Sequence, residues 1–143
     1  MISDLLASLL GTLLGGGLFE RRRRRRLARD LDEGRPLVFP GSVIGDAAYC
    51  RPAGGMLRLD GASLSWLTGR GGMSFPVPVE RLAARTLAAV RTSDAFTGGE
   101  NVAVVCDDDE LTVRIVVLKA DLPYLAVAVP GLRSLLAQTD REG

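Results

Sequence analysis

The chain has 143 residues, about one domain's worth, and its 47% hydrophobic and 24% charged content is typical of globular proteins. It has no histidine, which removes the commonest general base and the commonest metal ligand. Two cysteines without histidine are too few for a disulfide scaffold or a usual zinc site. We therefore expect no enzymatic activity, no catalytic residues, no metal and no cofactor.

The formal net charge of +1 conceals an uneven distribution. Seven arginines lie within residues 21–29, whereas the 110 residues from Gly34 to Gly143 carry eleven basic and twelve acidic side chains. We expect any electrostatic partner to bind the amino-terminal basic segment rather than the rest of the chain.

Residues 1–20 are predicted to form a transmembrane helix. Between Met1 and Phe19 the only ionisable side chain is Asp4. A helix over residues 2–19 would be about 27 Å long, just under the ~30 Å of the hydrocarbon core. The alternatives are a cleavable signal peptide, an interfacial helix and a buried helix of a soluble fold. The flanking charges weigh against a signal peptide. The lack of interleaved charges weighs against an interfacial helix, and the glycines weigh against a buried helix in water.

A stripe of small residues runs along one face of this predicted helix, formed by Ala7, Gly11 and Gly15. In lipid, such a stripe favours close approach of a second helix. The sequence therefore predicts homodimerisation or packing against a partner helix, with a helix that sits alone in lipid as the alternative.

Residues 21–35 are predicted to be a basic juxtamembrane segment and linker. Its arginines are Arg21, Arg22, Arg23, Arg24, Arg25 and Arg26. Arginines stay on the side of the membrane that requires no translocation, so we expect a single-pass cell-membrane protein with a cytoplasmic carboxy-terminal domain. They also suit anionic lipid headgroups. With no aromatic residue among them, nucleic-acid binding is not expected.

After the arginines the segment turns acidic, and Gly34 and Pro36 are expected to stop any helix. Residues 28–35 are then either a linker or the last helical turn. The domain from residue 36 to residue 143 follows.

Within this domain, apolar residues recur at every second position, as in β-strands. Residues 56–59 and 62–67 alternate apolar and polar side chains around Asp60-Gly61, a strong hairpin signal. Residues 74–79 form a proline-marked strand, expected at a sheet edge because Pro76 and Pro78 cannot donate ladder hydrogen bonds. Further strands are predicted within residues 42–49, 86–93, 101–106 and 111–118, which makes seven.

The chain is predicted to end in a helix. Asp121 is a plausible N-cap, Pro123 fits the first turn, and apolar residues recur at helical spacing from Leu122 to Leu132. Pro130-Gly131 interrupts the pattern, so either the helix kinks there or a second short helix covers residues 132–138.

Seven short strands followed by an apolar-faced helix is the element order of a pleckstrin-homology-like (PH-like) barrel or sandwich. Three stretches carry a family resemblance: residues 55–66, residues 75–78 and residues 102–107. They resemble a short actinobacterial family of unknown function whose members have one amino-terminal membrane span, a basic stretch and a PH-like domain. The resemblance covers about residues 40–130 and implies fold and topology, but no activity. The short apolar segment and Pro130 depart from the family pattern.

Two loops have compositions that occur in binding sites. The glycine-rich residues 68–73 precede an extended segment, not a helix, so they predict a hairpin loop with Arg70 at its tip, a candidate contact for a lipid phosphate. The acidic residues 107–110 are contiguous, without the alternating ligands of a calcium loop, and predict a solvated hairpin turn.

Two functions follow from these features. The first is a membrane-anchored interaction module, which binds an unknown protein partner through a strand edge or a groove. The second is an anionic-lipid or small-ligand binding domain at the membrane surface that uses Arg70 and the arginines of residues 21–26.

Overall fold

The computed structural model describes residues 17–51, 54–68, 72–90 and 100–142. The chain divides into two compact units, Met1–Arg35 and Pro36–Gly143. In the first unit, helix α2 covers Gly17–Asp32, so the residues after the arginines continue the helix. In the described ranges, no helix combines the length and the apolar character needed to cross a membrane. Most of the predicted span, residues 1–16, lies outside these ranges.

Helix α2 ends where the sequence predicts. Gly34 adopts φ +73°, a left-handed conformation that glycine reaches without steric cost. The N–H of Arg35 donates to the carbonyl of Asp30 at 2.8 Å, and the N–H of Gly34 donates to that of Leu31 at 3.2 Å. This pair of bonds is a Schellman motif, which satisfies two of the last carbonyls of the helix.

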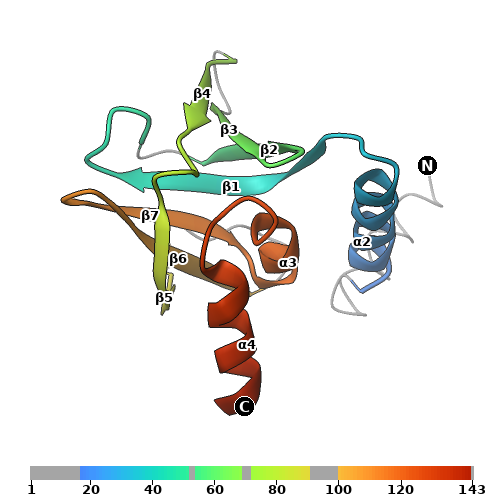
Figure 1. The fold of residues 1–143 in the computed structure, drawn as a ribbon. Helices are drawn as coiled ribbons and strands as arrows, with labels where there is room; N and C mark the ends of the chain where they lie inside the picture. The colour runs from blue at the N-terminus through green and yellow to red at the C-terminus, as the bar shows by residue number, and fades with distance from the viewer. Residues whose placement is uncertain (1–16, 52–53, 69–71, 91–99, 143) are drawn as a thin grey trace. The chain divides into compact units, whose positions relative to one another are not determined.

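The second unit is built on one antiparallel sheet of seven strands within the described residues. The strands are β1 (Leu37–Gly45), β2 (Gly55–Asp60), β3 (Ser63–Thr68), β4 (Ser74–Val77), β5 (Ala83–Ala89), β6 (Asn101–Asp108) and β7 (Leu111–Leu118). Their order is β4-β3-β2-β1-β7-β6-β5. Figure 1 shows β2, β3 and β4 on one side of β1, and β7, β6 and β5 on the other. The predicted mainly β fold is confirmed, and its sheet is consistent with a β-sandwich.

Strand β1 joins the two halves of the sheet. Its first half pairs with β2 and its second half with β7, and Gly41 pairs with both Gly55 and Val117. A Cβ at Gly41 would lie 2.5 Å from Cδ1 of Leu57, so only glycine fits this crossing without rearrangement. The buried indole N–H of Trp66 donates to the Gly41 carbonyl at 3.3 Å. The predicted strand within residues 42–49 is placed too late, because β1 already begins at residue 37.

The hairpin of β2 and β3 is confirmed with a one-residue shift. Its two-residue loop is Gly61-Ala62, not Asp60-Gly61, since Asp60 pairs with Ser63. Gly61 has φ +62°, which fits the turn type that requires glycine at the first loop position. The pairing places Leu57 opposite Trp66, and both are fully buried.

Two other strands differ from their predicted bounds. β4 ends at Val77, two residues earlier than predicted, and lies at one edge of the sheet, as its prolines predict. β5 begins at Ala83 instead of Thr86 and ends at Ala89, with a register irregularity between Ala84 and Thr86. Its alanines carry little hydrophobic period, so the pairing with β6 decides its position.

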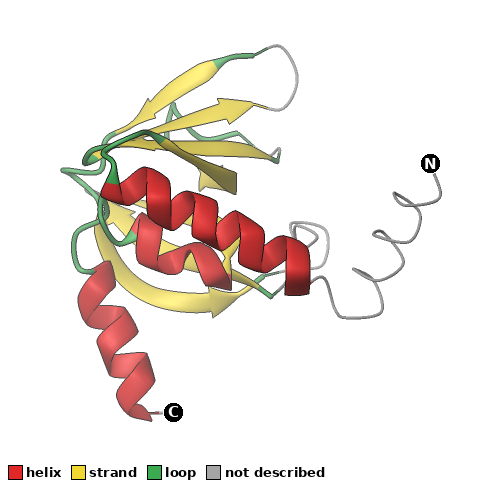
Figure 2. Ribbon diagram, turned by 90° about the vertical axis from the view of Figure 1, so that its right-hand side faces the viewer, coloured by secondary structure: helices red, strands yellow, loops and turns green. Residues whose placement is uncertain are grey.

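The carboxy-terminal segment forms two separate helices. A 3₁₀ turn (Lys119–Asp121) leads into α3 (Leu122–Leu125), and α4 covers Leu132–Glu142. Pro130 and Gly131, at φ +82°, separate them, so the second-helix alternative holds. Asp121 occupies the predicted N-cap position of α3, but its side chain makes no capping hydrogen bond. In both ribbon views α4 extends away from the strands (Figure 1 and Figure 2).

The core of this unit lies between the sheet and α3. The ring of Tyr124 in α3 lies 6.4 Å from that of Phe39 in β1, centroid to centroid. The buried apolar residues of the carboxy-terminal segment are Leu122, Leu125, Val129 and Leu132. The apolar residues predicted to share one helical face are therefore mostly buried, although a break between α3 and α4 divides them.

Candidate functional site

A hollow of about 680 Å³, which we call the slot, opens beside the edge strand β4. Ser63 and Ser65 of β3 contribute hydroxyls, and Pro76 and Val77 of β4 contribute apolar surface. The connection from β4 to β5 (residues 78–81) and Ala128 complete much of the wall. Its size and its mixture of apolar walls with a few polar groups are typical of ligand sites.

A second hollow of about 610 Å³ adjoins the β6–β7 turn. It is lined by Arg81 and by residues 108–111. Arg81 also lines the slot, so its side chain forms a wall common to both hollows.

Asp108 holds the Arg81 side chain that lines both hollows. Its Oδ2 accepts a 2.6 Å hydrogen bond from the Tyr49 hydroxyl and a 3.3 Å bond from Nη2 of Arg81. The Asp108 side chain is only 7% exposed, whereas that of Arg81 is 62% exposed. A buried carboxylate is stable only when it is paired, so Tyr49 and Arg81 satisfy Asp108, and Asp108 in turn orients both.

Tyr49 beside the slot and the two cysteines of the β domain all have raised pKa values. Burial, then the hydrogen bond to Asp108, raises the pKa of Tyr49 well above its usual range, so the phenol stays protonated and keeps donating. Burial also raises the pKa of the Cys50 thiol, and raises that of Cys106 to about 12. Both cysteines are buried and stay protonated at neutral pH, which makes them poor nucleophiles. Within the described ranges, no group of three or more histidine, cysteine or carboxylate residues is arranged to hold a metal ion.

The charge around the two hollows is negative. Among the described lining residues, the slot itself carries Glu80 and Arg81 and is formally neutral, and the second hollow adds Asp108, Asp109 and Glu110, so the two hollows together carry a formal charge of −3. Three of these carboxylates, those of Glu80, Asp109 and Glu110, belong to exposed residues. The negative charge therefore gathers in the second hollow, on the side of Arg81 away from the neutral slot.

The arginines of residues 21–26 all lie on α2. Five of them are exposed and Arg23 is half-buried. Six consecutive residues at 100° intervals cover the full circumference of a helix, so the positive charge surrounds α2. The predicted headgroup residue Arg70 and the predicted helix-association residues Ala7, Gly11 and Gly15 lie outside the described residues.

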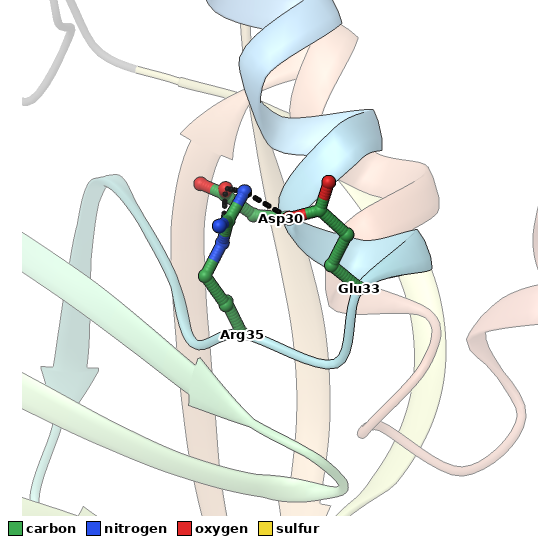
Figure 3. Close-up of polar contacts among 3 residues, drawn as sticks. All are labelled: Asp30, Glu33 and Arg35. Atoms are coloured by element: carbon green, nitrogen blue, oxygen red, sulfur yellow. Dashed lines mark hydrogen bonds and ion pairs between the residues drawn. The ribbon is translucent and has the colours of Figure 1, made fainter.

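Arg35 neutralises two of the carboxylates that follow the arginines. Its Nε and Nη2 lie 3.0 Å and 2.9 Å from Oδ1 of Asp30, and the same guanidinium pairs with Glu33 (Figure 3). The carboxylates at the end of α2 are thus held locally by a cation from beyond the helix. This cation also offsets the unfavourable placement of negative charge at a helix carboxyl end.

The Tyr49, Asp108 and Arg81 cluster was not anticipated from the sequence. The acidic residues 107–110 were expected to form a solvated turn, but the loop is only Asp109-Glu110, and Asp108 is buried at the end of β6. Asp109 has φ +58°, a conformation that aspartate tolerates better than most residues. The single local signal was an acidic residue at the end of an apolar strand, which says nothing of its partners.

The chain matches no protein-family model, no curated protein and no solved structure.

Proposed function

We propose that this chain is a membrane-anchored, non-enzymatic interaction module, in which a PH-like β domain is held at the cytoplasmic face of the cell membrane. The observation that carries the proposal is the run of six arginines around α2, five of them exposed. Such a run binds anionic headgroups at about 1 kcal/mol per residue near the surface.

The strand order supports a PH-like arrangement. The seven strands follow one another as an antiparallel meander that closes through the β1–β7 pair and is open between β4 and β5. Helical segments follow the last strand and bury Leu125 and Leu132 completely. A partly open sheet with buried helical residues beside it suits the binding of a partner, which is the role we propose.

The edge of β4 is a poor surface for strand addition. The N–H of Thr68 donates to the carbonyl of Met73 at 2.9 Å. In an antiparallel pair, only alternate residues point their backbone N–H and C=O groups toward the neighbouring strand. The backbone groups of Phe75 and Val77 therefore point toward β3, whereas those of Ser74 and Pro76 point toward the open edge. Proline has no N–H to offer there, so an added strand would lose a hydrogen bond.

The edge of β5 is also occupied at one position. The N–H of Ala84 donates to the carbonyl of Pro130 at 3.1 Å. The slot is therefore the better candidate for partner binding among the described surfaces. We assign headgroup contact to α2, which carries the arginine run, and partner contact to the slot, which together with the adjoining hollow carries a formal charge of −3.

The test is flotation of the full chain with liposomes of neutral lipid and with liposomes that contain anionic lipid, together with fractionation of cells that express it. We expect the chain in the membrane fraction, protected from external protease. Replacement of Arg21–Arg26 by glutamine keeps helix propensity and should remove the preference for anionic liposomes.

A control variant with Arg58→Gln and Arg133→Gln removes exposed arginines of the β domain and should float like the wild type. The proposal fails if the native chain is recovered only in the soluble fraction, or if the glutamine variant retains the full preference for anionic liposomes.

A further inference from the structure

We infer that the slot binds a short basic peptide segment of a partner protein, with apolar side chains against the β4 wall and a cationic side chain toward the carboxylates beside Arg81. This inference rests on the proposed role as an interaction module and names the chemical class of the partner.

The shape selects a short segment. About 680 Å³ accommodates a few side chains, in the range of drug-sized sites, and not a long helix. Ala62, Pro76, Pro78 and Ala128, which are exposed or half-buried, provide apolar surface for the partner's aliphatic groups, and the buried Leu64 and Val77 lie behind them. A peptide without apolar side chains would leave this surface exposed to water.

The polar groups select a peptide backbone. Ser63 and Ser65 contribute hydroxyls to the slot, and each can donate or accept a hydrogen bond. Arg81 bonds to Asp108 through Nη2 alone, and its side chain is 62% exposed. The other donors of its guanidinium are therefore available for peptide carbonyls, which are neutral acceptors.

The charge selects a basic side chain. The carboxylates of Glu80, Asp109 and Glu110 are exposed, while that of Asp108 already holds Arg81. The slot itself is formally neutral, with Glu80 beside Arg81, whereas the second hollow, which shares Arg81, adds Asp108, Asp109 and Glu110. A lysine or arginine side chain that reaches past Arg81 is therefore attracted there, and a phosphate or carboxylate in the same place is repelled. We therefore expect an anionic lipid headgroup to contact α2 rather than this end of the slot.

Three labelled hexapeptides test the inference: acetyl-Gly-Leu-Arg-Leu-Arg-Gly-amide and its counterparts with glutamine or glutamate in place of arginine. Their binding to the full chain, held in nanodiscs of neutral lipid, is measured by fluorescence anisotropy against empty nanodiscs. We expect the arginine peptide to bind best and to weaken as salt is raised. Equal binding of the arginine and glutamine peptides would overturn the charge argument.

Variants locate the site. Glu80→Gln with Asp109→Asn should weaken the arginine peptide by roughly 5-fold to 10-fold, since each exposed charge pair contributes modestly. Ser63→Trp, a substitution at an exposed strand position, should block the slot and abolish binding. Glu100→Gln changes one exposed charge at the opposite end of β6 and should leave binding unchanged.

The outcomes separate this inference from the proposed function. Loss of peptide binding in Ser63→Trp with unchanged flotation supports both. If no peptide binds, or if the glutamate peptide binds in a manner that Ser63→Trp abolishes, the inference is wrong, while the flotation result still decides membrane attachment. If Glu100→Gln weakened binding as much as Glu80→Gln with Asp109→Asn does, long-range charge, and not the slot, would govern binding.

Discussion

The hydroxyl of Tyr49 donates a 2.6 Å hydrogen bond to the carboxylate of Asp108, a residue 59 positions away in the sequence. This bond joins the loop between β1 and β2 to the end of β6, and Arg81 adds the connection between β4 and β5 through the same oxygen. Two separate connections of the β domain thus meet the end of β6 at one buried carboxylate, beside the slot.

Tyr49→Phe removes the short bond and leaves Asp108 with Arg81 alone. We expect the free energy of unfolding to fall by about 1.5–3 kcal/mol, the range for a hydrogen bond to a charged group. Urea denaturation followed by far-UV circular dichroism measures the change. Arg81→Gln is the matched control at the other bond and should cost less than about 1 kcal/mol, because Arg81 is exposed. Equal stability of Tyr49→Phe and the wild type would show that the bond contributes nothing.

The buried thiol of Cys106 makes stability depend on alkaline pH. Burial raises its pKa from 9.0 to about 12, so the folded state favours the protonated form. This stability is fully present below pH 9.0 and is lost as the pH rises toward 12. The loss can reach about 1.4 kcal/mol per pH unit for each such group.

Denaturation at pH 8, 9.5 and 10.5 should therefore show falling stability, and Cys106→Ala should show a smaller change over the same pH values. The raised pKa of Tyr49 acts in the same direction, but only above the ordinary tyrosine pKa of 10.0. Identical pH profiles for the wild type and Cys106→Ala would contradict this expectation.

Gly55 is required by close packing in the sheet. A Cβ on this residue would lie 2.2 Å from the backbone carbonyl oxygen of Leu67 and 2.9 Å from the indole nitrogen of Trp66. The obstruction is backbone and cannot rotate away, so Gly55→Ala should cost at least the ~1–3 kcal/mol of an overpacked core. Ser63→Ala, at an exposed position, should stay within about 0.5 kcal/mol of the wild type in the same denaturation assay. A Gly55→Ala variant as stable as Ser63→Ala would show that the strands separate easily there.

The prolines of β4 should suppress association between edges. Pro76→Val restores an N–H on the open edge and a β-branched residue that suits a strand. We expect concentration-dependent oligomers of this variant by size-exclusion chromatography with light scattering. Pro123→Ala removes an exposed proline from α3 and should keep the elution profile of the wild type. Unchanged elution of Pro76→Val would mean that another feature protects the edge.

The first turn of α4 should anchor the helix. Leu132 is fully buried, whereas Leu135 in the next turn is partly exposed. Leu132→Ala should therefore cost about 2–5 kcal/mol. Leu135→Ala should cost clearly less, because its side chain already contacts water. Comparable losses for the two variants in urea denaturation would show that α4 is more deeply buried than these exposures indicate.

Features that depend on a few neighbouring residues could be predicted from the sequence. The end of α2 at Gly34, the β2–β3 hairpin, the bounds of β7 and the edge position of β4 all follow from local φ preferences, alternation or missing N–H groups. Each of these properties belongs to the residues themselves, so a linear pattern contains them.

Other features arise only when distant segments meet. The start of β1 at Leu37 is fixed by its pairing with β2, and the start of β5 is fixed by its pairing with β6. Their own hydrophobic patterns are too weak to set these limits. For the same reason, the helix break at Pro130-Gly131 was an open alternative until the position of Gly131, close to Ala84 of β5, decided it.

The sequence by itself determined where positive charge gathers, that histidine chemistry is absent, and that strands dominate the domain, because these are properties of composition and period. The tertiary structure decided that Asp108 is buried and that Tyr49 and Arg81 hold it at the wall of the slot. A carboxylate is buried or solvated according to the partners that folding brings to it, and these three residues lie too far apart in the chain for a local pattern to show their meeting.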